Sequence, residues 1–170
     1  MRIILSIKTL PILQKNLSKS FHEAVIQIVK FQSKIILCGV GKSGLIASKI
    51  AATLSSFGTP SFYLSAGDSS HVDLGSISRK DILIVIRYSF NSKELKNIIK
   101  SRRRNIFLWI FITSKKNSDL YRNSNIKLIT PEVKEAGLDI VPTSSTINQL
   151  SIGDVLAIAT LKKRKISSID

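Results

Sequence analysis

A glycine-rich turn is the first feature of the sequence that could do chemistry. Gly39–Gly44 carries three glycines together with Lys42 and Ser43, and it separates an apolar run from a helical stretch. Backbone amides at such a turn and at a helix start bind anions, and Lys42 would add positive charge. A nucleotide P-loop is excluded because Ile36 stands where its first glycine is needed. The spacing also fits a dinucleotide fingerprint, but no acidic residue ends the next apolar run at 61–64 to hold a ribose. A small anion is therefore favoured over NAD.

Two further polar segments follow later apolar runs. Residues 67–75 contain His71, one of only two histidines, and the segment after Ile86 contains Ser89, Ser92 and Glu94. Hydroxyls and amides at a helix start hold phosphates, although a serine there is also an ordinary helix cap. The helix dipole would favour an acidic residue in the first turn in either case.

A last polar region precedes the final helical stretch. It combines Glu135 with four consecutive hydroxyl side chains: Thr143, Ser144, Ser145 and Thr146. These hydroxyls could cap the helix, or they could donate hydrogen bonds to a sugar phosphate.

The elements between these segments alternate between apolar runs and helical patterns. The spacing predicts an opening helix over about residues 9–31, strands at 34–39, 61–64, 82–86, 106–113 and 126–129, and helices at 43–56, 92–103 and 145–163. Continuous apolar strands separated by helices indicate a parallel sheet covered on both faces. We therefore expect one domain over residues 1–170, a three-layer α/β/α sandwich with a five-stranded, flavodoxin-like parallel sheet and a core at about 34–164. Ligands bind such sheets beyond the carboxyl ends of the strands, where the polar segments fall.

Composition narrows the class of protein further. The formal net charge is +15, and the chain has one cysteine and two histidines, which excludes an internal disulfide and a cysteine or histidine metal cage. No apolar run is long enough to span a membrane, and no secretory signal is recognisable, so we expect a cytoplasmic protein. The positive charge could serve an anionic partner, or it could reflect A/T-rich codons, which also encode the 27 Ile and 18 Lys. The basic run Arg102–Arg104 resembles an RNA-binding patch, but cations in a last helical turn also complement the helix dipole, so nucleic acid is not the expected partner.

Taken together, the polar segments resemble the sugar isomerase (SIS) domain of bacterial arabinose 5-phosphate isomerases. The family pattern is roughly Gly-x-Gly-Lys-Ser-Gly, Gly-x-Pro-Ser-Phe, His-x-Asp-Leu-Gly, Ser-x-Ser-x-Glu, Lys-Glu-Ala and Pro-Thr-Ser-Ser-Thr. In this chain the patterns stand, in order, at Gly39–Gly44, Gly58–Phe62, His71–Gly75, Ser89–Glu94 (altered), Lys134–Ala136 and Pro142–Thr146. The resemblance extends from about Lys34 to Lys163.

The resemblance implies an enzyme that interconverts ribulose 5-phosphate and arabinose 5-phosphate for Kdo and lipopolysaccharide synthesis. It implies that Glu135 or Glu94 is the proton-transfer base and that Lys42 stabilises developing negative charge. The residues expected to position the substrate are Ser43, Gly58, Thr59, His71, Ser89, Ser92, Thr143, Ser144, Ser145 and Thr146. It also implies a homo-oligomer, a tetramer by analogy with the family, with no cofactor. The family's metal-binding histidine is replaced by Ser65, so we expect no metal there.

Three departures from the family pattern leave alternatives open. Arg87-Tyr88-Ser89-Phe90 replaces a serine- and glycine-containing phosphate loop, and Phe90 fits poorly in a tight anion loop. This chain stops at Asp170, a few residues before the family's Ser-His-Pro-Gly-Gly segment, and lacks the CBS domains of the long family form. One alternative is therefore a catalytically impaired domain that binds phosphosugars. Another is a nucleic-acid-associated regulator.

Overall fold

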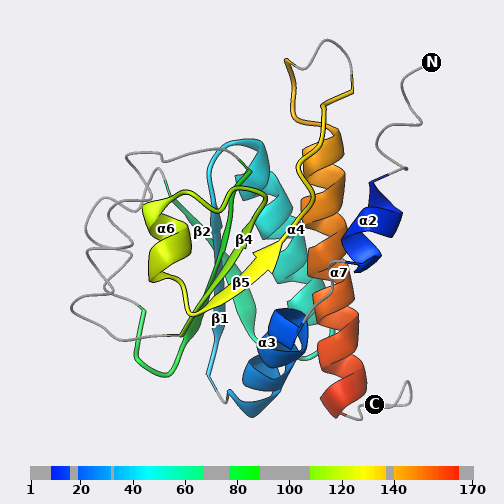
Figure 1. The fold of residues 1–170 in the computed structure, drawn as a ribbon. Coiled ribbons are helices and arrows are strands. Elements are labelled where there is room, and N and C mark those ends of the chain that lie inside the picture. The colour runs from blue at the N-terminus through cyan, green and yellow to red at the C-terminus, as the bar shows by residue number, and fades with distance from the viewer. Residues whose placement is uncertain are drawn as a thin grey trace.

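Five short strands form one parallel sheet at the centre of the molecule (Figure 1). The strands are β1 (Ile35–Gly39), β2 (Ser61–Ser65), β3 (Ile82–Ile86), β4 (Leu108–Thr113) and β5 (Ile126–Ile129), in the order β2-β1-β3-β4-β5. The computed structural model describes residues 9–15, 19–31, 33–66, 77–88, 108–136 and 140–164. Every residue of β1 and β3 is buried, which explains why these strands are continuous apolar runs.

Helices cover the two faces of the sheet unequally in the described residues. Helices α3 (Lys19–Lys30), α4 (Lys42–Ser56) and α7 (Ser144–Arg164) pack on one face, and α2 (Leu10–Lys15) contacts α7 (Figure 1). The short α6 (Asp119–Asn123) covers part of the other face, where Leu120 joins a second apolar cluster around Trp109. The alternating strand side chains therefore divide into two cores, one on each face of the sheet.

The predicted α/β fold with a five-stranded parallel sheet is confirmed. The strands at 82–86 and 126–129 have the predicted bounds, and α7 differs from the predicted helix by one residue at each end. The opening helix is described as two segments, α2 and α3, and the helix expected at 92–103 lies outside the described residues.

Helix α6 was not expected from the sequence. Its five residues bury only Leu120, so it has almost no amphipathic pattern, and the Ser118 hydroxyl caps it by accepting a hydrogen bond from the Tyr121 amide. Across the described parts of the chain, no helix combines the length and the apolar character that crossing a membrane would require.

Candidate active site

The glycine-rich turn leads from β1 directly into α4 at the carboxyl edge of the sheet. A Cβ atom on Gly39 would lie 2.7 Å from the Ser43 carbonyl oxygen, so only glycine allows this approach of strand and helix. Gly41 has a φ of 58°, a conformation that L side chains rarely adopt. Among the described residues, no side chain caps the start of α4, and Lys42 is exposed there. The first amides of α4 and an exposed cation thus face the same edge.

Helix α7 connects this turn to Glu135. The Ser43 hydroxyl donates to Oε1 of Gln149 at 3.1 Å, and the Ser145 amide donates to Oε2 of Glu135 at 3.2 Å. Ser145 and Gln149 are four residues apart, which places them on one face of the helix. The glycine-rich turn and the Glu135 carboxylate therefore contact the same face of α7, one helical turn apart.

The Glu135 carboxylate is held at the start of α7. Its Oε2 atom accepts hydrogen bonds from the Thr143 amide at 2.7 Å and from the Thr143 hydroxyl at 3.2 Å, in addition to the Ser145 amide. A carboxylate at a helix N-terminus is favoured by the helix dipole. These donors fix the orientation of the side chain.

The hydroxyl side chains predicted to bind substrate divide into two groups. Thr143 and Thr146 make local bonds, since the Thr143 hydroxyl accepts from the Ala136 amide at 2.8 Å and the Thr146 hydroxyl donates to the Thr143 carbonyl at 2.7 Å. Ser144 and Ser145 are buried in the single chain. Within the part of the chain that the structure describes, Oγ of Ser145 and Nε2 of Gln149 are buried without a hydrogen-bond partner. Two buried polar groups thus remain available on the α7 face that joins the turn to Glu135.

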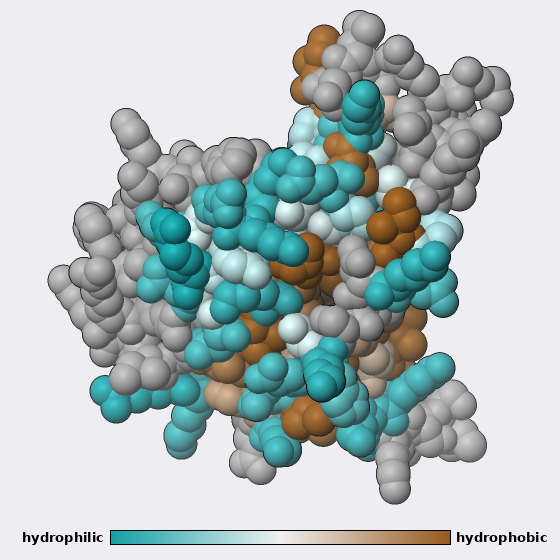
Figure 2. All heavy atoms as spheres, viewed as in Figure 1, coloured by the Kyte–Doolittle hydropathy of each residue, from teal (hydrophilic) through white to brown (hydrophobic). Residues whose placement is uncertain are grey.

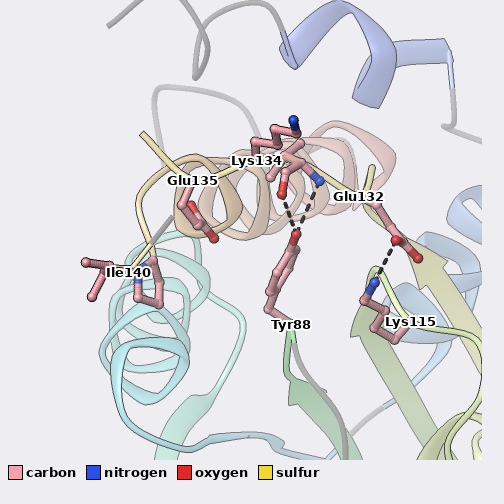
Figure 3. A pocket seen from close by; sticks show the side chains of 8 residues that line it. Tyr88, Lys115, Glu132, Lys134, Glu135 and Ile140 are labelled. Atoms are coloured by element: carbon pink, nitrogen blue, oxygen red, sulfur yellow. Dashed lines mark hydrogen bonds and ion pairs between the residues drawn. The ribbon is translucent and has the colours of Figure 1, made fainter. Parts of the chain in front are cut away.

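A hollow of about 550 Å³ opens beside Glu135 at the carboxyl ends of β3, β4 and β5. Its lining residues are Tyr88, Lys115, Glu132, Val133, Lys134, Glu135, Ile140 and Pro142. Figure 3 shows Tyr88 between Glu135 on one side and the Lys115–Glu132 ion pair on the other. The Tyr88 hydroxyl donates to the Val133 carbonyl at 2.7 Å and accepts from the Val133 amide at 3.2 Å. Tyr88 therefore braces the loop that carries Glu135.

A cation lies at the far side of this hollow. Lys115 donates to Glu132 at 2.6 Å, and this hydrogen bond raises the pKa of the Lys115 ammonium above its usual value. A second hollow of about 390 Å³, lined in part by Lys116 and Asn117, shares Lys115 and Glu132 with the first. Lys115 stays positively charged throughout the neutral range.

The structure places the other predicted site residues as follows. Gly58 and Thr59 lie between α4 and β2, at the opposite edge of the sheet, where the Thr59 amide donates to the Leu54 carbonyl. Within one chain they do not join Lys42 and Glu135. The remaining predicted residues, His71, Ser89, Ser92 and Glu94, lie outside the described residues.

Two observations concern metal binding and nucleophilic catalysis. In the described ranges, no group of three or more His, Cys, Asp or Glu side chains could hold a metal ion. Ser65 ends β2. Burial of Cys38 in β1 raises the pKa of its thiol to about 12, an effect that outweighs the opposing hydrogen bond with the Gly39 backbone. Because the thiolate is the reactive form, Cys38 is a core residue rather than a nucleophile.

Three residues of this region were missed by the sequence analysis. Tyr88 and Lys115 follow the third and fourth strands at the functional edge, so their positions alone could have identified them. Gln149 is fully buried in α7, and its partner Ser43 lies 106 residues away in the chain. The sequence could have indicated Gln149 because this polar residue shares a helix face with the buried residues Ile152 and Leu156.

The geometry defines an α/β domain with a polar site at the carboxyl edge of a parallel sheet, suited to a small anionic ligand. The SIS domain family model matches residues 28–159, so the chain belongs to the SIS domain family.

Named relatives agree with this membership. The chain is 39% identical over 170 residues to arabinose 5-phosphate isomerase KdsD of Francisella tularensis, covering 98% of this chain and 52% of that protein. The E. coli CFT073 protein c3406, in complex with arabinose 5-phosphate, is 29% identical with a TM-score of 0.78, covering 95% of this chain and 94% of that structure. A candidate phosphosugar isomerase involved in capsule formation from Bacteroides fragilis is also 29% identical, with a TM-score of 0.84 and coverage of 98% and 94%. The chain spans about half the length of the curated relatives it matches.

Proposed function

We propose that this chain is the sugar isomerase domain of an arabinose 5-phosphate isomerase and interconverts arabinose 5-phosphate and ribulose 5-phosphate. One observation carries the proposal. Glu135 is held at a hollow on the carboxyl edge of the sheet, and α7 joins it to the turn that bears Lys42. We infer the substrate from the relatives, since KdsD is named an arabinose 5-phosphate isomerase and the c3406 structure is a complex with arabinose 5-phosphate.

The reaction moves one proton between C1 and C2 of the sugar. Starting from the ketose, a base removes a proton from C1 while the C2 carbonyl oxygen gains one, which gives an enediol. Return of a proton to C2 and loss of the proton from the C1 hydroxyl then produce the aldose. Oxidation at C1 is balanced by reduction at C2 within one molecule, so the proposed reaction needs no cofactor.

Glu135 is our choice for the base, with Glu94 as the alternative. The donors on Oε2 of Glu135 leave its orientation fixed, which general-base catalysis requires. Lys42 would stabilise negative charge on the enediolate or the phosphate, because it lies next to uncapped amides at the start of α4. Ser43, Ser145 and the neighbouring hydroxyls would position the sugar phosphate, with His71, Ser89 and Ser92 as further proposed contacts. Gly58 and Thr59 could contact substrate only from another copy of the chain.

The wider setting follows from the same assignment. We propose a homotetramer in the cytoplasm that supplies arabinose 5-phosphate to Kdo and lipopolysaccharide synthesis, with no metal in the site.

A domain that binds phosphosugars without turnover is the second candidate. Three hydrogen bonds from Thr143 and Ser145 already occupy Oε2 of Glu135, and the same bonds would form if this carboxylate capped the start of α7 without taking part in catalysis. Under this alternative, the site holds the ligand but lacks an effective base.

The test compares Glu135→Gln with the matched variant Glu132→Gln. Both residues line the hollow and precede α7, but Glu132 pairs with Lys115. We expect Glu135→Gln to lower kcat by about 10²–10⁴-fold while calorimetric binding of arabinose 5-phosphate persists. Glu132→Gln should leave kcat nearly unchanged. Equal kcat values for Glu135→Gln and the wild type would refute Glu135 as the base. Ligand binding with no wild-type turnover would favour the binding-only alternative.

A further inference from the structure

A third hollow lies at the opposite edge of the sheet, where the strands begin. It measures about 470 Å³ and is lined by Lys30, Phe31, Ser33, Arg79 and Lys80. Lys30 ends α3, while Arg79 and Lys80 form the turn that leads into β3. In Figure 1 this edge lies at the bottom, and Figure 2 shows hydrophilic side chains along the same lower rim. The hollow is therefore separated by the length of the strands from the site proposed for the sugar phosphate.

Among the described residues, no acidic side chain forms an ion pair with the three cations that line this hollow. Lys30, Arg79 and Lys80 are exposed, and none of them takes part in the ion pairs found among the described residues. Three like charges in one small hollow repel one another unless an anion lies between them.

The one acidic side chain beside the hollow, within the described ranges, is already balanced. Asp81 is fully buried, and it accepts hydrogen bonds from the Ser33 hydroxyl at 2.6 Å and the Ser78 amide at 2.7 Å. Lys34 lies 3.3 Å from the same carboxylate. Burial alone would raise the pKa of Asp81, but these contacts outweigh burial and hold the pKa below its usual value. Asp81 thus cancels the charge of Lys34 and fixes the turn that carries Arg79 and Lys80.

The carbonyl groups at the end of α3 are also partly satisfied. A helix C-terminus carries partial negative charge, which would oppose an anion. Here the Ile28 carbonyl accepts a hydrogen bond from Arg164 at 3.3 Å, and the Gln27 carbonyl accepts one from the Phe31 amide at 3.0 Å. Arg164 ends α7 beside Lys162 and Lys163, so it brings further positive charge to this edge.

We propose that this hollow, lined by Lys30, Arg79 and Lys80, is a second anion site that binds a compact ligand carrying two or more phosphate groups. The volume lies within the range of small-molecule sites. A planar guanidinium binds phosphate oxygens in pairs, and lysine adds point charge, which matches a diphosphate better than a singly charged ligand. The three cations line one hollow of about 470 Å³, which favours a compact ligand over a nucleic acid strand. This site does not depend on the proposed isomerase function.

The experiment is a calorimetric titration of the full chain with inorganic pyrophosphate at low ionic strength, where exposed charges are weakly screened. We expect saturable binding that arabinose 5-phosphate does not compete away. The double variant Arg79→Ala/Lys80→Ala should weaken this binding by about tenfold or more, since it removes two phosphate contacts. The control Lys15→Ala/Lys19→Ala removes the same net charge from exposed positions on α2 and α3 away from the hollow, and it should change the affinity by less than about twofold.

Several results would overturn the proposal. These are absence of pyrophosphate binding to the wild type, equal binding by the wild type and the Arg79/Lys80 variant, or displacement of pyrophosphate by arabinose 5-phosphate. Tighter binding of a single-stranded RNA of about twelve nucleotides through the same residues would show that the ligand class is wrong. Circular dichroism of both double variants controls for folding, because all four substituted residues are exposed.

Discussion

The two edges of the sheet use polar residues in different ways. At the carboxyl edge, Glu135 and Ser43 are tied to α7 by hydrogen bonds, and the glycine turn presents uncapped amides. At the amino edge, one carboxylate is buried as an internal support, and cations project freely around it. The comparison shows that the same parallel sheet can organise a preoriented polar site at one end and a region of unbalanced charge at the other. A fixed orientation is what general-base catalysis by Glu135 requires, whereas the cations at the amino edge can attract and bind an anion.

The largest effect that would sharpen this contrast is expected at Lys42. Lys42→Ala should lower kcat/KM for ribulose 5-phosphate by about 10²–10³-fold, because it removes positive charge from beside the developing enediolate. Lys42 is exposed, so the melting temperature should stay close to that of the wild type. The control is Lys80→Ala at the opposite edge, which should retain normal kcat/KM. Similar losses in both variants would remove the functional difference between the edges.

The second prediction concerns the internal support at the amino edge. Asp81→Asn should lower the free energy of unfolding by about 1–3 kcal/mol at neutral pH, since it weakens the bonds from Ser33 and Ser78 and leaves Lys34 without its charge partner. Urea unfolding measures this difference. The exposed Asp119→Asn variant, which loses only a surface pair with Arg122, is the control.

The pH dependence of that difference has a definite sign. The pKa of Asp81 is lowered by folding, so its stabilisation is present above the pKa of the unfolded chain and is lost as pH falls through the folded value. The gap in stability between wild type and Asp81→Asn should therefore narrow below about pH 4. A gap that is constant from neutral to acid pH would show that the Asp81 charge contributes nothing.

The smallest effect is expected at Lys115. Its contact with Glu132 is on the surface, and such pairs contribute little to stability. Lys115→Ala should leave the urea midpoint unchanged, and Lys115→Arg should behave in the same way. A clear destabilisation by Lys115→Ala would indicate that the hollow at the carboxyl edge depends on this pair.

The fold could be predicted well because each extensively buried strand or helix has a continuous or periodic pattern of apolar residues in its own segment of the sequence. The strand at 82–86 is apolar at every position, and both of its faces are covered in the structure. Helix α6 was missed because five residues with one buried side chain leave no periodic pattern. Local patterns thus identify elements whose burial is extensive and fail for those with little burial.

The site was only partly predictable for a different reason. Glu135 and Lys42 could be proposed from motifs and from their positions after strands. The bond between Ser43 and Gln149 joins residues distant in sequence, so no local pattern could indicate it. Gly58 and Thr59 entered the prediction through family resemblance, yet the topology places them before β2 at the other edge. The proposed roles of His71, Ser89, Ser92 and Glu94 remain predictions.

The most direct test of the proposed sugar phosphate site is an NMR titration of the ¹⁵N-labelled chain with arabinose 5-phosphate. If the sugar phosphate binds at the carboxyl edge, backbone amide shifts will change at Gly41, Lys42 and Ser43, and at Glu135 and Ser145. Amides of Lys30, Arg79 and Lys80 should keep their positions, because they lie at the other edge of the sheet. Changes concentrated at Lys30, Arg79 and Lys80, with none at the carboxyl edge, would contradict the assignment of the sugar phosphate site.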